Sequence, residues 1–373
     1  MWQAEVLVDL DAIRSNVTKL RAATTAQVMA VVKADGYGHG AVPCARAALE
    51  GGATWLGVCT LAEALELRAA GIEAPVLAWL IGPGQPLHQA IEADVDLSAA
   101  GVDQLAEIVT AATVVGEPAR VHLKIDTGLH RNGATAQTWP ALLEAAAKAE
   151  ADGLIEVIGV WSHFVYADAP GHETIDQQLV AFGEALDVAE SFGITPQLRH
   201  IANSAATLTR TDAHFDLVRP GIAVYGLSPI AGETFGLRPA MTAHARVLLT
   251  KQVGPDEGVS YGHTYQTRSD TTLALVPLGY ADGVPRAASN VGPIAVNGKR
   301  YTIAGRVCMD QVMLDCGDDG VHPGDEAILF GPGDRGEPTA TDWADAIGTI
   351  NYEIVTRFGS GRVPRTFAGE RHG

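Results

Sequence analysis

The chain has 373 residues and a formal net charge of −18, with 47% hydrophobic and 19% charged residues. This length is too great for one ordinary hydrophobic core and predicts roughly two domains. The negative charge argues against a nucleic-acid or anionic-membrane partner, and no stretch approaches the roughly 20 apolar residues that span a bilayer.

Four cysteines are scattered without a C-x-x-C pair, which indicates a reducing compartment with neither a disulfide framework nor a structural zinc site. The N-terminus has acidic residues where a secretory signal would have basic ones. We therefore expect a cytoplasmic protein. Because the chain is acidic, any bound phosphate or carboxylate must be held by a local cluster of Lys, Arg or helix ends.

Short apolar runs alternate with helical patterns over about the first 225 residues. The runs are Val28–Val32, Trp55–Cys59, Val76–Leu80, Val95–Leu97, Arg120–Ile125, Val157–Trp161, Leu198–Ala202 and Leu217–Val218. One helix is predicted over Thr60–Ala70, where Thr60 and Glu63 form a capping-box pattern, and another over Gln177–Phe192 before Gly193. Such units fit a (β/α)8 TIM barrel over residues 1–235. A doubly wound sheet is the alternative, because periodicity alone does not separate the two.

After about residue 235 the sequence pattern changes to stretches rich in Val and Thr in which apolar and polar residues alternate. They are Ala243–Val253, Thr272–Pro277, Ile294–Val296, Tyr301–Ala304, Val312–Asp315 and Ala327–Phe330. They predict a mainly antiparallel β C-terminal domain over residues 236–373, to which the first few residues of the chain are candidates to pair. One late helix is predicted at Trp343–Ile347, with Asp342 as a candidate cap.

Lys33 directly follows the first apolar run, so it should stand at the C-terminal end of the first barrel strand, where barrel enzymes carry catalytic groups. Gly36, Gly38 and Gly40 would let the backbone approach a ligand closely. Taken alone, a solvated lysine at a strand end is the commoner explanation.

The loops after the seventh and eighth runs carry Ser204 and the segment Arg219-Pro220-Gly221-Ile222. Barrels commonly bind phosphate at these two loops through backbone N–H groups. A lysine on the first strand facing such a phosphate site is the arrangement that pyridoxal phosphate needs. A capping serine and an ordinary turn are the alternatives for each loop alone.

Eight segments together resemble the motifs of alanine racemases, in the family's order. They are AVVKADGYGHG (30–40), HLKIDTGLHRNG (122–133), RHIANSAA (199–206), VRPGIAVYG (218–226), VSYG (259–262), PLGYADG (277–283), RVCMDQ (306–311) and INYEI (350–354). The resemblance implies a pyridoxal 5'-phosphate enzyme that interconverts L- and D-alanine in the cytoplasm and supplies D-alanine for peptidoglycan.

The resemblance also implies a role for each matching residue. Lys33 is similar to the lysine that carries the cofactor and acts as one base, and Tyr261 to the opposing base. The matches around the cofactor are Tyr37, His163, Ser204, Arg219, Gly221, Ile222 and Tyr352, with Arg219 facing the pyridine nitrogen. Arg131 and the backbone near Met309 match groups that hold the substrate carboxylate and the cofactor's phenolic oxygen. Lys124 matches a supporting lysine that is carbamylated in several relatives, and Tyr280 a residue near the entrance; no metal is expected.

Racemisation needs a base on each face of the substrate. In the family, Tyr261 and Met309 correspond to residues donated by a second subunit, so the resemblance implies a homodimer with shared active sites. His130 departs from the family pattern, since a glycine is frequent before Arg131; this puts the orientation of that loop and carbamylation of Lys124 in question. The alternatives are a serine or broad-specificity racemase, and a non-catalytic pyridoxal phosphate homeostasis protein, which would have no use for Tyr261.

Several other patterns are weaker. A single Asp126-Thr127-Gly128 does not make an aspartic protease, which needs two facing carboxylates. The segment Gly331-x-Gly333-x-x-Gly336 lacks a following apolar helix and is interpreted as a surface turn. His39, His163 and His200 have no metal-ligand spacing, and Cys308 has no assignable base.

Overall fold

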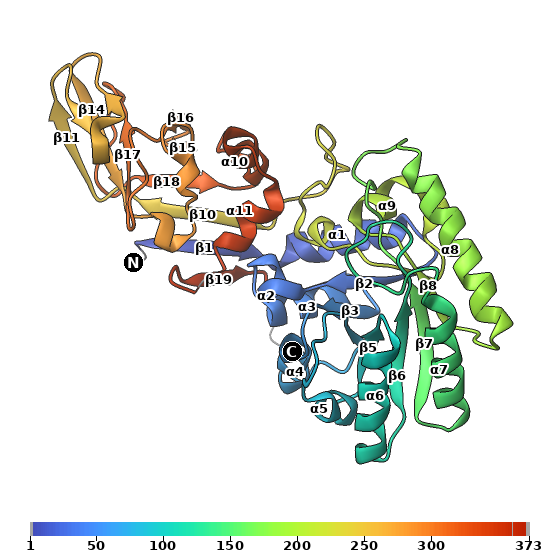
Figure 1. The fold of residues 1–373 in the computed structure, drawn as a ribbon. Coiled ribbons are helices and arrows are strands. Elements are labelled where there is room, and N and C mark those ends of the chain that lie inside the picture. Colours follow the sequence, from blue (N-terminus) through green and yellow to red (C-terminus); the bar gives the residue numbers. More distant parts are fainter. Residues whose placement is uncertain (1–2, 360, 371–373) are drawn as a thin grey trace. The chain divides into compact units, whose positions relative to one another are not determined.

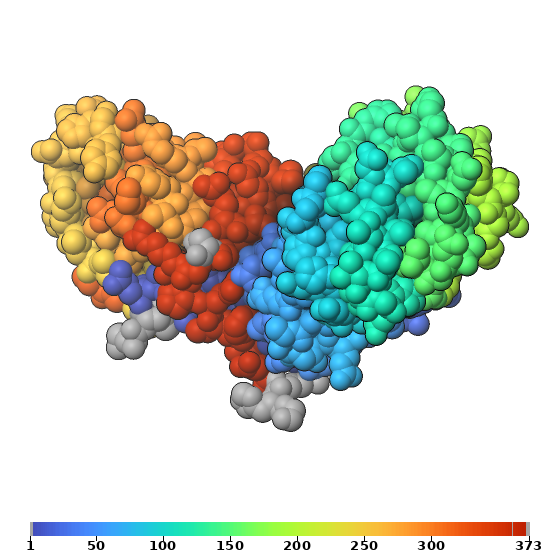
Figure 2. Space-filling model, turned by 60° about the horizontal axis from the view of Figure 1, so that its bottom comes forward, coloured from blue at the N-terminus to red at the C-terminus, as the bar shows by residue number. Residues whose placement is uncertain are grey.

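The computed structural model describes residues 3–359 and 361–370. It divides into two compact units. Figure 2 draws the chain in space-filling form with the same colours along the sequence as Figure 1. We call Arg14–Gly36 with Ala41–Leu237 the barrel unit, and Met1–Ile13 with Tyr37–Gly40 and Arg238–Gly373 the β unit. Within the described part of the chain, no helix is long and apolar enough to cross a membrane.

The barrel unit is built on eight parallel strands. They are β2 (Gln27–Val31), β3 (Trp55–Val58), β4 (Val76–Ala78), β5 (Val95–Ala99), β6 (Ala119–Lys124), β7 (Ile155–Trp161), β8 (Leu198–His200) and β9 (Leu217–Val218). Their order in the sheet is β8-β7-β6-β5-β4-β3-β2-β9. The backbone N–H of Asp216 donates to Arg199 O (3.1 Å) and that of Arg219 to Ala202 O (2.9 Å), which joins the two ends of the sheet. The predicted TIM-like barrel is therefore confirmed over the doubly wound alternative, since a doubly wound sheet has free edges and a reversal of strand order.

Helices of the barrel unit alternate with its strands, and α6, α7 and α8 are seen outside β5, β6 and β7 in Figure 1. They are α1 (Leu10–Ala22), α2 (Lys33–Tyr37), α3 (Ala41–Glu50), α4 (Leu61–Ala69), α5 (Leu87–Glu92), α6 (Val102–Val115), α7 (Trp139–Ala151), α8 (Thr174–Ser191) and α9 (Ser204–Thr209). The first residues of α1 and the last of α2 belong to the β unit. Short 3₁₀ turns follow at Thr211–Ala213 and Ile222–Tyr225.

The local signals at the helix ends were largely right. Thr60 caps α4, and its side chain and that of Glu63 form the predicted reciprocal capping box. Helix α8 begins at Thr174 rather than at Gln177. The additional turn buries Ile175, so packing extends the helix beyond its predicted start.

The β unit contains a six-stranded sheet in the order β16-β15-β18-β10-β1-β19, a three-stranded sheet in the order β11-β14-β17, and the pair β12-β13. The strands are β1 (Ala4–Asp9), β10 (Met241–Arg246), β11 (Leu249–Val253), β12 (Gly258–Val259), β13 (Tyr265–Gln266), β14 (Thr271–Val276), β15 (Pro293–Val296), β16 (Lys299–Thr302), β17 (Val312–Asp315), β18 (Glu326–Phe330) and β19 (Arg365–Ala368). All pairings are antiparallel except that of β1 with β19, so the mainly antiparallel prediction is confirmed. Strand β1, the first of the chain, lies between β10 and β19.

Three details of the β unit differ from the prediction. The expected strand Ala243–Val253 is two strands, β10 and β11, which belong to different sheets. Helix α10 (Ala340–Ile347) begins earlier than predicted, and its cap is Thr339; Asp342 is the reciprocal partner three residues into the helix. A second helix, α11 (Asn351–Arg357), was not predicted, because seven residues carry too little periodicity to be distinguished from a loop.

Candidate active site

Lys33 stands two residues beyond the end of β2, at the start of a left-handed turn. Ala34, Asp35, Gly36 and Tyr37 have φ values of 52°, 52°, 61° and 52°. Each non-glycine residue in this conformation costs on the order of 1 kcal/mol, and a run of them is found where surrounding bonds hold it for function. The Gly36 N–H donates to Val32 O (2.9 Å), closing the turn.

The carboxylate of Glu63 ties this turn to the neighbouring strand. Its Oε1 accepts from the Ala34 N–H (2.7 Å), while Oε2 accepts from the N–H groups of Cys59 (2.8 Å) and Thr60 (2.9 Å). One side chain therefore caps α4 and fixes the backbone next to Lys33.

Four cations of the barrel unit interact around this turn: Lys33, Lys124, Arg131 and Arg219. Burial, together with the charges of Arg219 and Arg131, lowers the pKa of Lys124 to about 7. Burial, aided by Arg131, also lowers the pKa of Lys33, against the opposing effect of Cys59 and of the Glu63 carboxylate. In a chain of charge −18, four mutually repelling cations indicate a site for an anion.

Two tryptophans lie beneath these cations. Lys124 Nζ is 4.2 Å and Arg219 Cζ 4.8 Å from the centre of the Trp161 ring, within the range of cation–π attraction. Lys33 Nζ is 5.9 Å from the centre of the Trp79 ring. Gly57 leaves room for Trp79, because a Cβ there would come within 2.6 Å of that ring.

Arg219 is buried and extensively bonded. Its Nη1 lies 3.0 Å from His200 Nδ1, and Nη2 donates to Ser162 O (2.8 Å) and lies 3.3 Å from His163 Nδ1. Burial lowers the pKa of Arg219 to about 9, so the guanidinium stays charged at neutral pH. Burial and the surrounding cations, Arg219 first, hold the pKa of His163 well below its usual range, so this ring is neutral and accepts through Nδ1.

The two predicted phosphate loops meet through a side-chain hydroxyl. Ser204 Oγ accepts from the N–H groups of Gly221 (2.8 Å) and Ala223 (3.3 Å), so its own hydrogen can be donated elsewhere. Asn203, not Ser204, caps α9. Among the described residues, the Ile222 N–H has no protein acceptor. A hydroxyl and a backbone N–H suited to phosphate thus lie together.

The β unit brings Tyr261, Tyr280 and Met309 around Cys308, although they are far apart in sequence. The Tyr280 N–H donates to Cys308 O (3.0 Å), and Ser260 Oγ lies 3.4 Å from Cys308 Sγ. All three remain largely exposed, by 70% for Tyr261, 40% for Tyr280 and 52% for Met309. Together they form an exposed patch of large side chains around Cys308.

Tyr37 and Tyr352 also meet within the β unit, with ring centres 6.2 Å apart. The approach depends on Gly38, because a Cβ there would come within 2.5 Å of Val355 O on α11. The structure therefore joins the motif that follows Lys33 to the INYEI motif.

His130 adopts a left-handed conformation, with φ of 54°. This explains why glycine is frequent at this position in the resembling family, since glycine has no penalty there. The Asp126 carboxylate holds the turn by accepting from the N–H groups of Gly128 (2.9 Å) and His130 (3.1 Å). Arg131 follows with an exposed guanidinium that has no hydrogen-bond acceptor in the described part of the protein.

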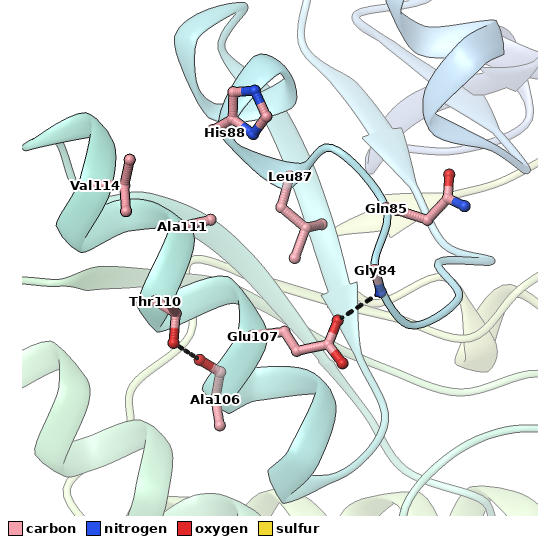
Figure 3. A pocket seen from close by; sticks show the side chains of 9 residues that line it. All are labelled: Gly84, Gln85, Leu87, His88, Ala106, Glu107, Thr110, Ala111 and Val114. Carbon is pink, nitrogen blue, oxygen red and sulfur yellow. Dashed lines mark hydrogen bonds between the residues drawn. The ribbon is translucent and has the colours of Figure 1, made fainter.

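The weaker sequence patterns have structural roles. Asp126 organises a turn rather than facing a second carboxylate, and the Gly331–Gly336 loop closes on Glu337, which accepts from the N–H of Gly333 (2.8 Å). The described residues contain no cluster of three potential metal ligands. A surface pocket between α5 and α6, shown in Figure 3, is lined without Lys or Arg and therefore lacks the cations of the site around Lys33.

Comparison with known proteins gives the family. Residues 8–229 match the family described as "Alanine racemase, N-terminal domain" and residues 240–367 its C-terminal domain. The chain belongs to the alanine racemase family. It is 70% identical, over all of both chains, to an alanine racemase of Salinispora arenicola.

Solved structures of alanine racemases agree closely with this chain. The structure from Streptomyces lavendulae is 54% identical, with a TM-score of 0.98, covering 100% of this chain and 98% of the other. The structure from Streptomyces coelicolor A3(2) is 56% identical, with a TM-score of 0.97, covering 99% and 98%.

Sequence reasoning gave no role at the site to Glu63, Asp96, His122 or Trp161, which surround these residues. One signal was present. Alternate residues of a barrel strand point to the interior, and both β5 and β6 carry polar residues at alternate positions, Asp96 and Ser98 on β5 and Arg120, His122 and Lys124 on β6.

Proposed function

We propose that this protein is a pyridoxal 5'-phosphate-dependent alanine racemase that interconverts L- and D-alanine. The observation that carries the proposal is the gathering of Lys33, Lys124, Arg131 and Arg219 at the C-terminal end of a TIM-like barrel. The residues fit the cofactor, because a lysine with a lowered pKa lies in the same unit as phosphate donors and a buried arginine.

When bound, pyridoxal phosphate withdraws electrons from the substrate and so acidifies its Cα–H. Lys33 would carry the cofactor and move the proton at Cα on one face, for which its lowered pKa favours the unprotonated, basic amine. Tyr261 would hold or accept the proton on the opposite face. Arg131, exposed and without an acceptor among the described residues, has the planar fork that binds a carboxylate.

The remaining residues would bind and orient the cofactor. Arg219 donates hydrogen bonds and keeps its proton, so it would face the pyridine nitrogen as a donor. The phosphate would be held by the Ser204 hydroxyl and the Ile222 N–H, with Gly221 binding the Ser204 hydroxyl and so orienting it, and, from the β unit, by Tyr37 and Tyr352. Neutral His163 would lie beside the tyrosine base, and Tyr280 near the entrance.

Lys124 would support Arg131. With a pKa of about 7, a large fraction of its amine is unprotonated at neutral pH, and the unprotonated amine is the form that carbon dioxide carbamylates. A carbamate there would place a negative charge among three cations and orient the Arg131 fork.

We also propose a homodimer with shared sites. Tyr261 and Met309 are too exposed to work as a water-excluded base and a substrate contact within one chain, so a second copy would cover them. The enzyme would act in the cytoplasm and supply D-alanine for peptidoglycan.

Borohydride reduction followed by peptide mapping, together with a chiral assay on alanine and serine, tests the proposal. We expect the cofactor on Lys33 and racemisation of alanine faster than serine. Tyr261→Phe should retain the cofactor and lose racemisation. Label on another lysine, or undiminished activity of Tyr261→Phe, would contradict the assignment.

A further inference from the structure

A chain of hydrogen bonds crosses the interior of the barrel from Arg219 to Arg120. Arg219 Nη1 lies 3.0 Å from His200 Nδ1, His200 Nε2 lies 2.9 Å from His122 Nδ1, and His122 Nε2 lies 3.0 Å from Asp96 Oδ2. Arg120 Nε donates to the other carboxylate oxygen of Asp96 (2.8 Å). Of the residues in this hydrogen-bond chain, only Arg219 has a role in the proposed function.

This hydrogen-bond chain is protected from water. Asp96 is 1% exposed, both histidines are 0% exposed, and Arg219 is 4% exposed. His200 stacks on Trp161 with ring centres 5.7 Å apart and an interplanar angle of 5°. Gly159 is required between the two histidines, because a Cβ there would come within 2.4 Å of His122 Nδ1.

The two ends of the hydrogen-bond chain, Arg219 and Asp96, determine which ring nitrogen of each histidine carries the proton. A guanidinium only donates, so His200 Nδ1 must accept and its proton must be on Nε2. That proton is donated to His122 Nδ1, which puts the His122 proton on Nε2, where the Asp96 carboxylate, an acceptor only, receives it. Each link is satisfied with two neutral imidazoles. Burial and the charge of Arg219 hold the pKa of His200 well below its usual range, which agrees with a neutral ring.

We propose that Asp96 is a positioning residue for Arg219, acting through the fixed tautomers of His122 and His200. If His122 changed tautomer, His200 Nδ1 would carry a proton that points at an Arg219 N–H, and the guanidinium would have to move. The proposal rests on the proposed function in one respect only, which is that Arg219 orients the bound cofactor. The hydrogen-bond chain itself does not depend on catalysis.

Asp96→Asn is the informative substitution, because it changes one oxygen to an NH₂ group. Arg120 Nε would donate to the side-chain oxygen that remains in this variant, so the new NH₂ group would lie opposite His122 Nε2. His122 would then accept at Nε2 and donate from Nδ1, which reverses the chain as far as Arg219. Glu156→Gln is the matched control, since Glu156 lies 3.7 Å from Arg120 at the same rim and has no bond to His122.

The primary measurement is ¹⁵N NMR of the purified full-length protein labelled at histidine, with the two resonances assigned by single replacement of each residue. In the unsubstituted protein we expect the ring proton of each histidine on Nε2, with Nδ1 of each accepting, and His200 neutral at neutral pH. Asp96→Asn should move the His200 proton to Nδ1, and Glu156→Gln should leave it on Nε2. A cationic ring, or His200 protonated on Nδ1 in the unsubstituted protein, overturns the proposal even if Asp96→Asn does not fold.

Racemase kinetics supply the second measurement. Removing the hydrogen-bond partner of a metal ligand typically costs about 10- to 100-fold, and by the same orienting logic Asp96→Asn should lower kcat by a factor in this range while Glu156→Gln should not. A changed tautomer with unchanged kcat would also overturn the positioning role. If the unsubstituted protein does not racemise alanine but shows the expected tautomers, the proposed function fails while the hydrogen-bond chain stands.

Discussion

Replacing Lys124 with methionine should stabilise the protein. A pKa lowered from 10.5 to about 7 means that protonating Lys124 costs roughly 5 kcal/mol more in the folded protein than in the unfolded chain. The contact of Nζ with the Trp161 ring, 4.2 Å from its centre, offsets about 1–2 kcal/mol of this. Methionine has similar length and no charge, so Lys124→Met should raise the free energy of unfolding by about 3 kcal/mol at pH 6.

The sign of the pH dependence follows from the same pKa. Below about pH 7 the lysine is charged in both states and the full cost is present; between pH 7 and 10.5 only the unfolded chain holds the proton, so the cost disappears as the pH rises. The stabilisation by Lys124→Met should therefore be smaller at pH 9 than at pH 6.

Urea unfolding at both pH values, in buffer free of bicarbonate, measures this effect. Lys148→Met on α7 is the control, because Lys148 is exposed, and it should change stability little at either pH. If Lys124→Met is destabilising at pH 6, or its effect is the same at pH 6 and 9, the reasoning about the buried amine is wrong. Racemase activity should fall in this variant, which would separate stability from function.

Three further predictions each concern a substitution at one residue and a control at a second position or with a second side chain. Glu63→Gln places an NH₂ group opposite a backbone N–H near Lys33, so it should lower the free energy of unfolding by about 1–2 kcal/mol, measured by urea unfolding. Glu66→Gln, on the exposed side of α4, is the control and should leave the free energy of unfolding unchanged. Gly159→Ala should destabilise by about 1–3 kcal/mol because its Cβ meets an imidazole ring, and Gly183→Ala, with open space in α8, should stabilise by about 1 kcal/mol; equal effects would refute the steric argument. At His130, with φ of 54°, valine should cost about 1–2 kcal/mol and glycine less than about 0.5 kcal/mol in thermal unfolding, and a tolerated valine would argue against the left-handed conformation.

Much of the fold was determined by short-range signals in the sequence. Each of the eight predicted barrel strands overlaps an observed one, because a strand buried on both faces must be apolar throughout. The α4 capping box was also predicted, since its two members are three residues apart and interact within one turn. The order of the eight motifs indicated the family, because short motifs can be recognised in the sequence without knowledge of the tertiary structure.

The prediction was weaker where short elements depend on packing. Helix α11 and the division of Ala243–Val253 into β10 and β11 were missed, because seven residues or one bend carry little periodicity. The second role of Glu63 was also missed. Its contact with Ala34 joins residues 29 positions apart, and no local pattern encodes it.

The sequence by itself predicted which residues carry chemistry, while only the tertiary structure decided which of them meet. The chain from Asp96 to Arg219 depends on the register of four strands, including an irregularity between Val121 and His122 that pairs His122 with Gly159. The pKa of Lys124 likewise depends on burial and on Arg131 and Arg219, which lie in the loops after β6 and β9. Side-chain periodicity shows which face a residue takes, but strand register and burial set its partners and its charge, and both arise only when the barrel closes.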